Sequence, residues 1–212
     1  MDLDAIAVAL FGAPLAPAPR AALDGYLALL HRWNATYNLT AVRDPEQMRI
    51  QHVADCLAVI PPLRRWRAGH PVRRVLDVGS GAGLPAVVIA ALEPDLEVVS
   101  VDAVGKKAAF VRQVAGELGL RNLRAEHARV EQLKAGRFEL VTARAFASLA
   151  DLVSLTRAHL ADGGAWMAMK GKRPDDELAA LPPGVSLFHV EPLTVPGLDA
   201  ERCLVWLQPS AA

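Results

Sequence analysis

The feature that most constrains the fold is a glycine-rich loop between two short apolar runs. Residues 75–88 read VLDVGSGAGLPAVV, with glycines at positions 79, 81 and 83. Glycine permits positive φ and lets the backbone approach a ligand closely. A loop of this kind between a strand and a helix is typical of a parallel α/β sheet, where free N–H groups at the helix start bind a polar ligand.

Short apolar runs that alternate with helical patterns follow this loop. The expected strands cover residues 74–78, 97–101, 123–126, 138–143, 164–169, 186–190 and 203–207. The expected helices between them cover residues 85–92, 106–118, 130–133 and 149–160. This alternation predicts a doubly wound, mostly parallel seven-stranded sheet with helices on both faces. Only a connection with proline and glycine separates the last two strands, which favours an antiparallel hairpin and a reversed last strand.

The residues before the first strand have a helical pattern instead. Apolar residues recur at helical spacing over residues 21–34, which predicts an amphipathic helix. Asp44-Pro45 predicts the start of another helix, which we expect to end at Pro61-Pro62. We therefore expect a helical extension over residues 1–70, packed on a core domain over residues 71–212.

Composition argues against several classes of protein. The 212 residues are 52% hydrophobic and 22% charged, as in a globular chain with no membrane span. The chain starts with Asp2 and Asp4, unlike the basic start of an export signal. Cys56 and Cys203 form no CxxC or CxxH pattern, so we expect neither a disulfide nor a metal site. These observations predict a cytoplasmic protein without membrane contact or an obligate protein partner.

Charge is balanced along the chain, because 23 Lys and Arg residues face 23 Asp and Glu residues. A protein that coats nucleic acid through bulk charge is strongly basic, so any polyanion site must be local. Basic clusters next to expected strand ends comprise Arg64, Arg65, Arg67, Arg73 and Arg74, then Lys106 and Lys107, then Lys170, Lys172 and Arg173. Each cluster is equally compatible with a solvated surface.

Two carboxylates help to identify the ligand of the loop. Residues 81–86, GAGLPA, match the fingerprint of dinucleotide-binding enzymes, but Asp77 would repel a pyrophosphate and attract a cation. S-adenosylmethionine carries a positive amino group and a positive sulfonium. Asp102, at the end of the next expected strand, can accept hydrogen bonds from the hydroxyls of a ribose. Either acid could instead cap a turn or helix, yet their combination at neighbouring strand ends favours S-adenosylmethionine.

Several motifs together resemble one enzyme family. They are WNATYNLT, HVADCL, DVGSGAGLP, VDAVGKKAAFVRQV, RVEQL, ARAFASL and MKGK, which extend from Trp33 to the segment around Gly171. The combination is similar to the bacterial small-subunit ribosomal RNA guanine-N7 methyltransferases, also called glucose-inhibited division protein B. The resemblance implies a class I, Rossmann-like methyltransferase fold with S-adenosylmethionine as cofactor. It also implies methyl transfer to N7 of a guanine in the conserved loop of 16S rRNA near the decoding site.

The resemblance and the strand ends together select the site residues. The expected cofactor-binding residues are Asp77, Gly79, Ser80, Gly81, Gly83, Leu84, Asp102, Val130, Glu131 and Arg144. The catalytic candidates are Arg144, His52 and Asp55, and the RNA-binding candidates are Lys106, Lys107 and Lys170. An ion pair is the structural alternative for Arg144, and a hydrogen bond between helix and core is the alternative for His52 and Asp55. Leu84, Ala86 and Cys56 depart mildly from the family pattern, and Cys56 weakens any specific role for its position.

The chemistry of the implied reaction limits what the protein must supply. Guanine N7 has a lone pair and no proton to lose, so its methylation needs placement and no general base. N7 faces a groove of A-form RNA that side chains cannot enter, so the base must lie in a loop or be flipped out. The zero net charge predicts that a small-subunit particle supplies part of the binding surface. A small-molecule methyltransferase, a nicotinamide-dependent oxidoreductase and a non-catalytic rRNA-binding assembly factor remain as alternatives.

Overall fold

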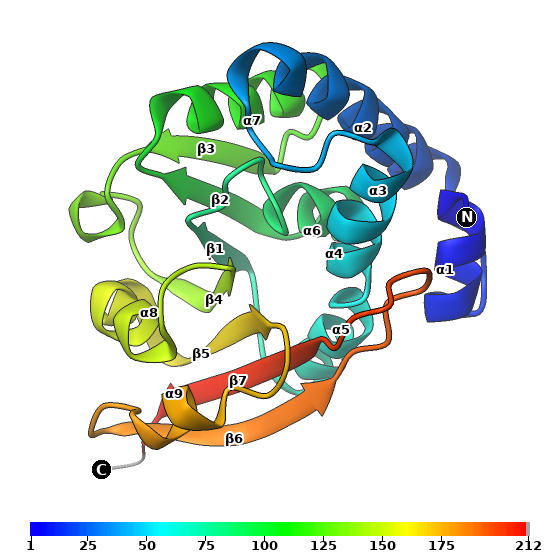
Figure 1. The fold of residues 1–212 in the computed structure, drawn as a ribbon. Helices are drawn as coiled ribbons and strands as arrows, with labels where there is room; N and C mark the ends of the chain where they lie inside the picture. Colours follow the sequence, from blue (N-terminus) through cyan, green and yellow to red (C-terminus); the bar gives the residue numbers. More distant parts are fainter. Residues whose placement is uncertain (211–212) are drawn as a thin grey trace.

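The computed structural model describes residues 1–210, which form one seven-stranded sheet with helices on both faces (Figure 1). The order of the strands is β3-β2-β1-β4-β5-β7-β6. Their bounds are β1 (Arg74–Val78), β2 (Glu97–Asp102), β3 (Leu123–His127), β4 (Phe138–Arg144), β5 (Leu160–Lys170), β6 (Val185–Pro192) and β7 (Cys203–Pro209). The prediction of a mostly parallel, doubly wound sheet is confirmed.

The reversed strand lies inside the sheet. β7 pairs antiparallel with both β5 and β6, and all other neighbours pair in parallel. The predicted hairpin and the predicted reversal of the last strand are therefore confirmed. Because β7 enters between β5 and β6, the edge of the sheet is formed by β6.

The helices form two layers. One layer contains α1 (Leu3–Phe11), α2 (Pro17–Tyr37), α3 (Pro45–Met48), α4 (Asp55–Leu57), α5 (Ile60–Gly69), α6 (Ala86–Leu92) and α7 (Gly105–Glu117). The other contains α8 (Leu149–Thr156), with the short α9 (Asp175–Ala179) next to it. Side chains alternate between the faces of a strand, and β1 follows this rule. Val75 belongs to the apolar cluster of the first layer, and Leu76 belongs to that of the second.

The helices before β1 share one apolar core with the sheet. Leu23 and Leu57 lie in the same buried cluster as Val75 and Phe110. Tyr26 of α2 is fully buried, and its hydroxyl donates a hydrogen bond of 2.9 Å to the carbonyl of Ala82 in the glycine loop. The N-terminal helix α2 thus supports the glycine loop through this hydrogen bond. The division of the chain into two domains at residue 70 stays a prediction.

Several predicted boundaries in the helical region were wrong. Pro61 and Pro62 lie in the first turn of α5 and do not end a helix, because that turn does not need their missing N–H groups. Asp44 caps α3 as expected, but the segment continues as a π-helical stretch, η1 (Arg49–Ala54), before α4. The first predicted helix is longer, since α2 runs to Tyr37 and ends at Asn38 in the left-handed conformation.

Two further elements differ beyond the first strand. Residues 130–133 form only a short 3-10 turn, η2 (Val130–Gln132), instead of an α-helix. The helix expected over 149–160 ends at Thr156, and a second 3-10 turn, η3 (Arg157–His159), leads directly into β5. The short α9 was not predicted. Local pattern alone does not resolve elements of three to five residues.

We expect Tyr26→Phe to lower the free energy of unfolding by about 1–3 kcal/mol, because it leaves the buried carbonyl of Ala82 without this donor. Urea denaturation measures the change. Tyr37→Phe is the matched control, since that side chain is 44% exposed. Equal stability of the Tyr26 variant and the wild type would contradict the proposed support of the loop by α2.

Candidate active site

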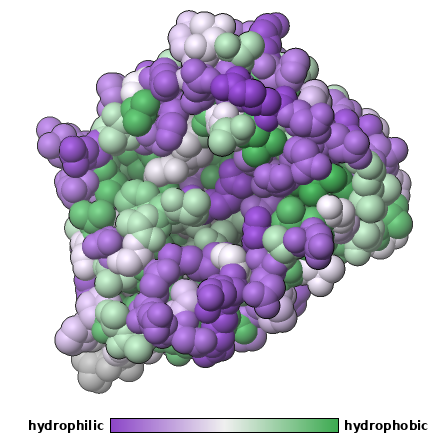
Figure 2. Space-filling model, viewed as in Figure 1, coloured by the Kyte–Doolittle hydropathy of each residue, from purple (hydrophilic) through white to green (hydrophobic). Residues whose placement is uncertain are grey.

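Two neighbouring cavities open at the carboxyl ends of the parallel strands. The first, of about 140 Å³, lies at the ends of β1, β2 and β3 and is lined by Gly79, Asp102, Val130, Glu131 and Phe146, among others. The second, of about 320 Å³, lies at the ends of β4 and β5 and is lined by Asp55, Ala145, Met169, Lys170 and Arg202, together with Arg144. Figure 2 shows that this face is hollowed near its centre, where apolar and hydrophilic surfaces meet.

The glycine loop forms one wall of the first cavity. Gly79 has φ 65°, and its N–H donates to the carbonyl of Val101 at 2.9 Å. A Cβ atom at this position would collide with the ring of Phe146. Gly83 has φ 85° and faces the core, where a Cβ would lie 2.9 Å from side-chain atoms of Val87 and Val111. Gly79 therefore makes room for the ring of Phe146, whereas Gly83 permits close packing of the loop on the helices.

Asp102 ties this loop to the neighbouring strand. One carboxylate oxygen accepts from the N–H of Gly81 at 2.9 Å, and the other accepts from the N–H of Val104 at 2.8 Å. Each oxygen of an ionised carboxylate has a further lone pair. Asp102 lines the first cavity, so it can accept hydroxyl groups there while it holds the loop and the start of α7. Both sequence interpretations of this residue, a hydroxyl acceptor and a cap, are compatible with its position.

Asp77 lies below the loop and lines neither cavity. It is fully buried, and Oδ2 accepts from the N–H of Ala86 at 3.1 Å. Within residues 1–210, its Oδ1 has no hydrogen-bond partner. Burial raises the pKa of this carboxyl group to about 7. Buried polar atoms are nearly always paired, so the unpaired Oδ1 is an exception, and the raised pKa reflects the cost of burying a charge there.

The remaining cofactor candidates lie at different depths. Val130 and Glu131 of η2 line the first cavity. The distance from Nε2 of His159 to the carbonyl oxygen of Val130 is 2.7 Å, a hydrogen bond that holds η2 in place. Leu84 is buried in the core, and the Ser80 hydroxyl hydrogen-bonds to Ser100 at 2.6 Å inside it. Neither residue lines a cavity, and the backbone N–H groups of both already donate within the chain.

The second cavity contains an acid between two arginines. Asp55, 3% exposed, accepts from Arg144 through Oδ2 at 3.2 Å and from Arg202 through Oδ1 at 2.9 Å. Arg144 also donates to the carbonyl of Gln51 at 3.1 Å. Arg144 and Asp55 were predicted in the site from the sequence, but Arg202 was not. A single arginine in a polar connection before the last strand has no local signal, and only the reversal of β7 places it here.

His52 lies next to this cluster but does not line the cavity. Its Nε2 atom is 2.8 Å from the hydroxyl of Thr40, and burial together with the Arg144 guanidinium lowers its pKa. Within the described residues, its Nδ1 atom has no partner. His52 thus joins η1 to the loop after α2, which is the structural alternative considered from the sequence.

The basic residues singled out from the sequence mostly have acidic or carbonyl partners. Lys170 lines the second cavity and binds Glu177 at 2.8 Å, while Lys106 donates to the carbonyl of Tyr37 at 2.7 Å. Lys107 lies half-buried on α7. In the arginine cluster before and in β1, the ion pairs join Arg64 and Arg67 to Glu93, Arg65 to Glu191 and Arg74 to Glu97. That cluster is therefore largely neutralised.

Among residues 1–210, no group of three His, Cys, Asp or Glu side chains could hold a metal ion. Over the same residues, no helix is long and apolar enough to cross a membrane.

The seven-stranded sheet with one reversed strand is the fold of the class I methyltransferases. The glycopeptide N-methyltransferase MtfA, solved in complex with S-adenosyl-L-methionine, superposes with a TM-score of 0.59 at 14% identity and covers 74% of this chain and 94% of its own. TrmN from Thermus thermophilus superposes with a TM-score of 0.58 at 26% identity. That match covers 73% of this chain, which spans 48% of the longer TrmN chain.

Sequence comparison identifies the family. The family model of rRNA small subunit methyltransferase G, GidB, matches residues 20–205. The ribosomal RNA small subunit methyltransferase G of Leptothrix cholodnii is 60% identical over 198 residues, which cover 93% of this chain and 90% of the relative. The protein of the same name from Bordetella avium is 53% identical and covers 87% and 83%. The chain therefore belongs to the rRNA small subunit methyltransferase G family, which confirms the resemblance of its motifs.

We expect Asp55→Asn to lower the free energy of unfolding by about 2 kcal/mol, because two partly buried guanidinium groups lose their shared counter-charge. Denaturation by urea measures this change. Asp175→Asn is the matched control, since its ion pair with Arg173 is exposed and should contribute little. Equal effects of the two substitutions would show that the Asp55 cluster is no more important for folding than a surface pair.

Asp77 should make stability depend on pH. Its pKa rises from 3.8 to about 7 on folding, so its contribution is most favourable below pH 4 and is lost as the pH approaches 7. The unfolding free energy of the wild type should therefore fall relative to that of Asp77→Asn across this interval, by at most roughly 4 kcal/mol. Urea titrations of both proteins at several pH values measure the difference. Parallel pH profiles would contradict a buried carboxyl group with a raised pKa.

Proposed function

We propose that this protein transfers a methyl group from S-adenosylmethionine to N7 of a guanine in 16S rRNA. The observation that carries the proposal is the pair of adjoining cavities in a chain of this family. One cavity has the carboxylate and the glycine loop that suit an adenosine cofactor, and the other has arginines that suit an RNA phosphate. Both open at the carboxyl ends of parallel strands, where ligands bind in open α/β sheets.

The residues around the first cavity fit S-adenosylmethionine. Asp102 can accept ribose hydroxyls, and Val130 and Glu131 lie where the adenine edge would meet the backbone. Gly79 lines this cavity, and Asp77 lies buried below the glycine loop and supports it through the N–H of Ala86. When bound, the cofactor supplies a methyl group on a positively charged sulfur atom. The Asp102 carboxylate, which lines this cavity, fits such a positively charged ligand better than it fits a diphosphate coenzyme.

The residues around the second cavity would position the acceptor. N7 becomes positively charged as it is methylated, so a cation against the imidazole ring would oppose the reaction. We therefore assign Arg144, Arg202 and Lys170 to the phosphates of the nucleotide. Asp55 holds the first two of these in place from one side. His52 contributes by fixing η1, and the transfer itself requires alignment of the reactants without a general base.

We further propose that the substrate is 16S rRNA within a small-subunit particle, in the cytoplasm. The chain has a formal net charge of zero, and its arginine cluster around β1 is paired with acids. Bulk attraction to naked RNA is therefore weak. We propose that Lys106 and Lys107 at the start of α7 add local contacts to the RNA, and that ribosomal surface supplies the remaining ones.

The test is methylation of 16S rRNA with labelled S-adenosylmethionine, using small-subunit particles purified from cells that lack this protein. Mass spectrometry of nuclease digests should find one added methyl group on N7 of a single guanine. Naked 16S transcript should react more slowly than the particle, because particle proteins and folded RNA complete the binding surface.

The outcome separates the proposal from its rivals. Label in a small molecule from cell extract, with none in rRNA, would contradict the RNA substrate. Binding to the particle without transfer would indicate an assembly factor. A melting temperature that rises with NAD and not with S-adenosylmethionine would contradict the cofactor itself.

A further inference from the structure

We propose that Phe146 is the acceptor-positioning residue of this site, and that its ring stacks on the guanine that receives the methyl group. The inference rests on the proposed function, because it names what that site does with its second substrate. Phe146 was not selected from the sequence, and it lies in the loop of residues 145–147 directly after β4.

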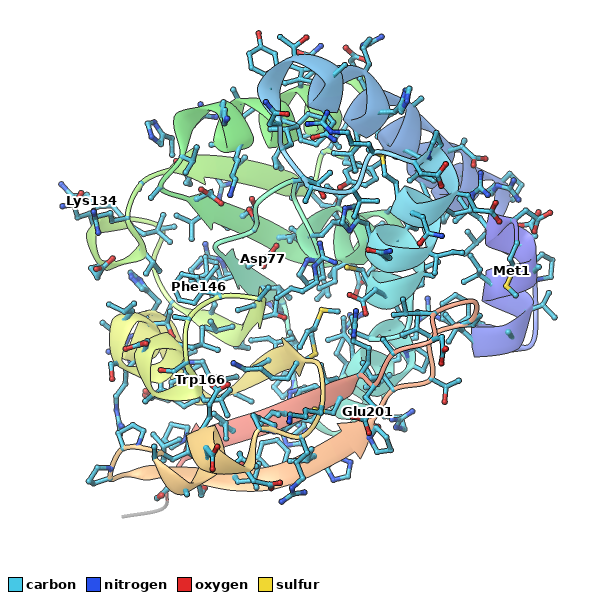
Figure 3. All side chains as sticks on the ribbon, in the orientation of Figure 1. Met1, Asp77, Lys134, Phe146, Trp166 and Glu201 are labelled. Carbon is cyan, nitrogen blue, oxygen red and sulfur yellow. The ribbon has the colours of Figure 1, made fainter. Side chains whose placement is uncertain are left out.

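This loop separates the two cavities. Phe146 lines the first cavity, and the preceding residue, Ala145, lines the second. The ring of Phe146 lies against Gly79, where a Cβ atom would collide with it. Figure 3 places Phe146 in the space between β1 and α8, on the hollowed face of the molecule. A methyl group that passes from a donor in one cavity to an acceptor in the other must pass this ring.

The backbone of the loop is strained, whereas its flanks are firmly held. Ala145 has φ 52° and Ala147 has φ 28°, both in a region that residues other than glycine rarely adopt. On one side, Arg144 is bound to Asp55; on the other, Ser148 caps α8 through a reciprocal capping box with Asp151. A strained tripeptide between fixed ends can exchange one conformation for another without disturbing the sheet. We infer that binding of both substrates moves the ring from Gly79 to the face of the acceptor base.

The chemistry of the acceptor favours an aromatic ring at this position. Stacking on an aromatic side chain holds an unpaired base whatever its sequence context, while phosphate contacts set its register. A guanine methylated at N7 carries a positive charge, and the face of an aromatic ring attracts cations. The ring therefore binds the developing product charge more strongly than it binds the neutral guanine, which accelerates the transfer. The arginines of the second cavity cannot serve this purpose, because they carry the same sign of charge.

Three substitutions test this inference: Phe146→Leu, Phe146→Tyr and, as the matched control, Phe188→Leu. Leucine keeps most of the apolar volume but removes the aromatic face, and tyrosine keeps that face. Phe188 is a 37% exposed ring on the edge strand β6, outside both cavities. The measurements are methyl transfer to small-subunit particles, giving kcat and KM, and calorimetric binding of S-adenosylmethionine.

We expect Phe146→Leu to lower kcat/KM for the particle by roughly 10- to 100-fold, with cofactor affinity changed by less than about three-fold. Phe146→Tyr should retain activity within a few-fold of the wild type, and Phe188→Leu should be unchanged. Wild-type kinetics in Phe146→Leu would overturn the inference, since the ring would then only fill space. A parallel loss of cofactor affinity would also overturn it, because the ring would then act on the cofactor and not on the acceptor base. Absence of transfer by the wild type would instead refute the proposed function, whatever the variants do.

Discussion

The carboxylate of Asp102 is the interaction on which the architecture of the site depends. It joins the glycine loop after β1 to the backbone after β2, with one hydrogen bond to each. The N–H of Gly79 and the hydroxyl of Ser80 add further hydrogen bonds from this loop to β2, so the two strand ends are tied together and the first cavity between them has a fixed shape. Tyr26 supports the same loop from the opposite side through Ala82. The loop is thus held by a strand on one side and by an N-terminal helix on the other.

The second cavity depends on a different kind of constraint. Asp55 comes from α4, Arg144 from the end of β4 and Arg202 from the connection before β7, and they meet in one ion-pair cluster. Guanidinium groups with a buried shared carboxylate lose little freedom when they bind an anion. The cluster therefore provides rigidity as well as charge, at the place where an RNA phosphate would need both.

Much of this organisation follows from local pattern in the sequence, and the failures have physical causes. The seven strands were predictable because buried parallel strands are short apolar runs between helices, and Asp102 was identifiable because it follows one of them. The depth of Asp77 was not predictable, since periodicity does not say whether a carboxylate faces a cavity or the core. Arg202 and Phe146 were not predicted as site residues, because only tertiary contacts place them there: Arg202 binds Asp55, and Phe146 packs on Gly79. An α-helix was predicted where only the short η2 turn forms, because three residues are too few for hydrophobic periodicity to tell the two apart.

The direction of β7 determines when the second cavity can form during folding. Since this strand runs opposite to β5, its first residues reach the carboxyl edge of the sheet and bring Arg202 to Asp55. A parallel last strand would begin at the far edge and leave the cluster incomplete. During synthesis, the strand must emerge from the ribosomal tunnel and insert between β5 and β6 before the second cavity exists. The first cavity is lined by residues between positions 78 and 155, whereas the second also needs Arg202 and is complete only once β7 is in place.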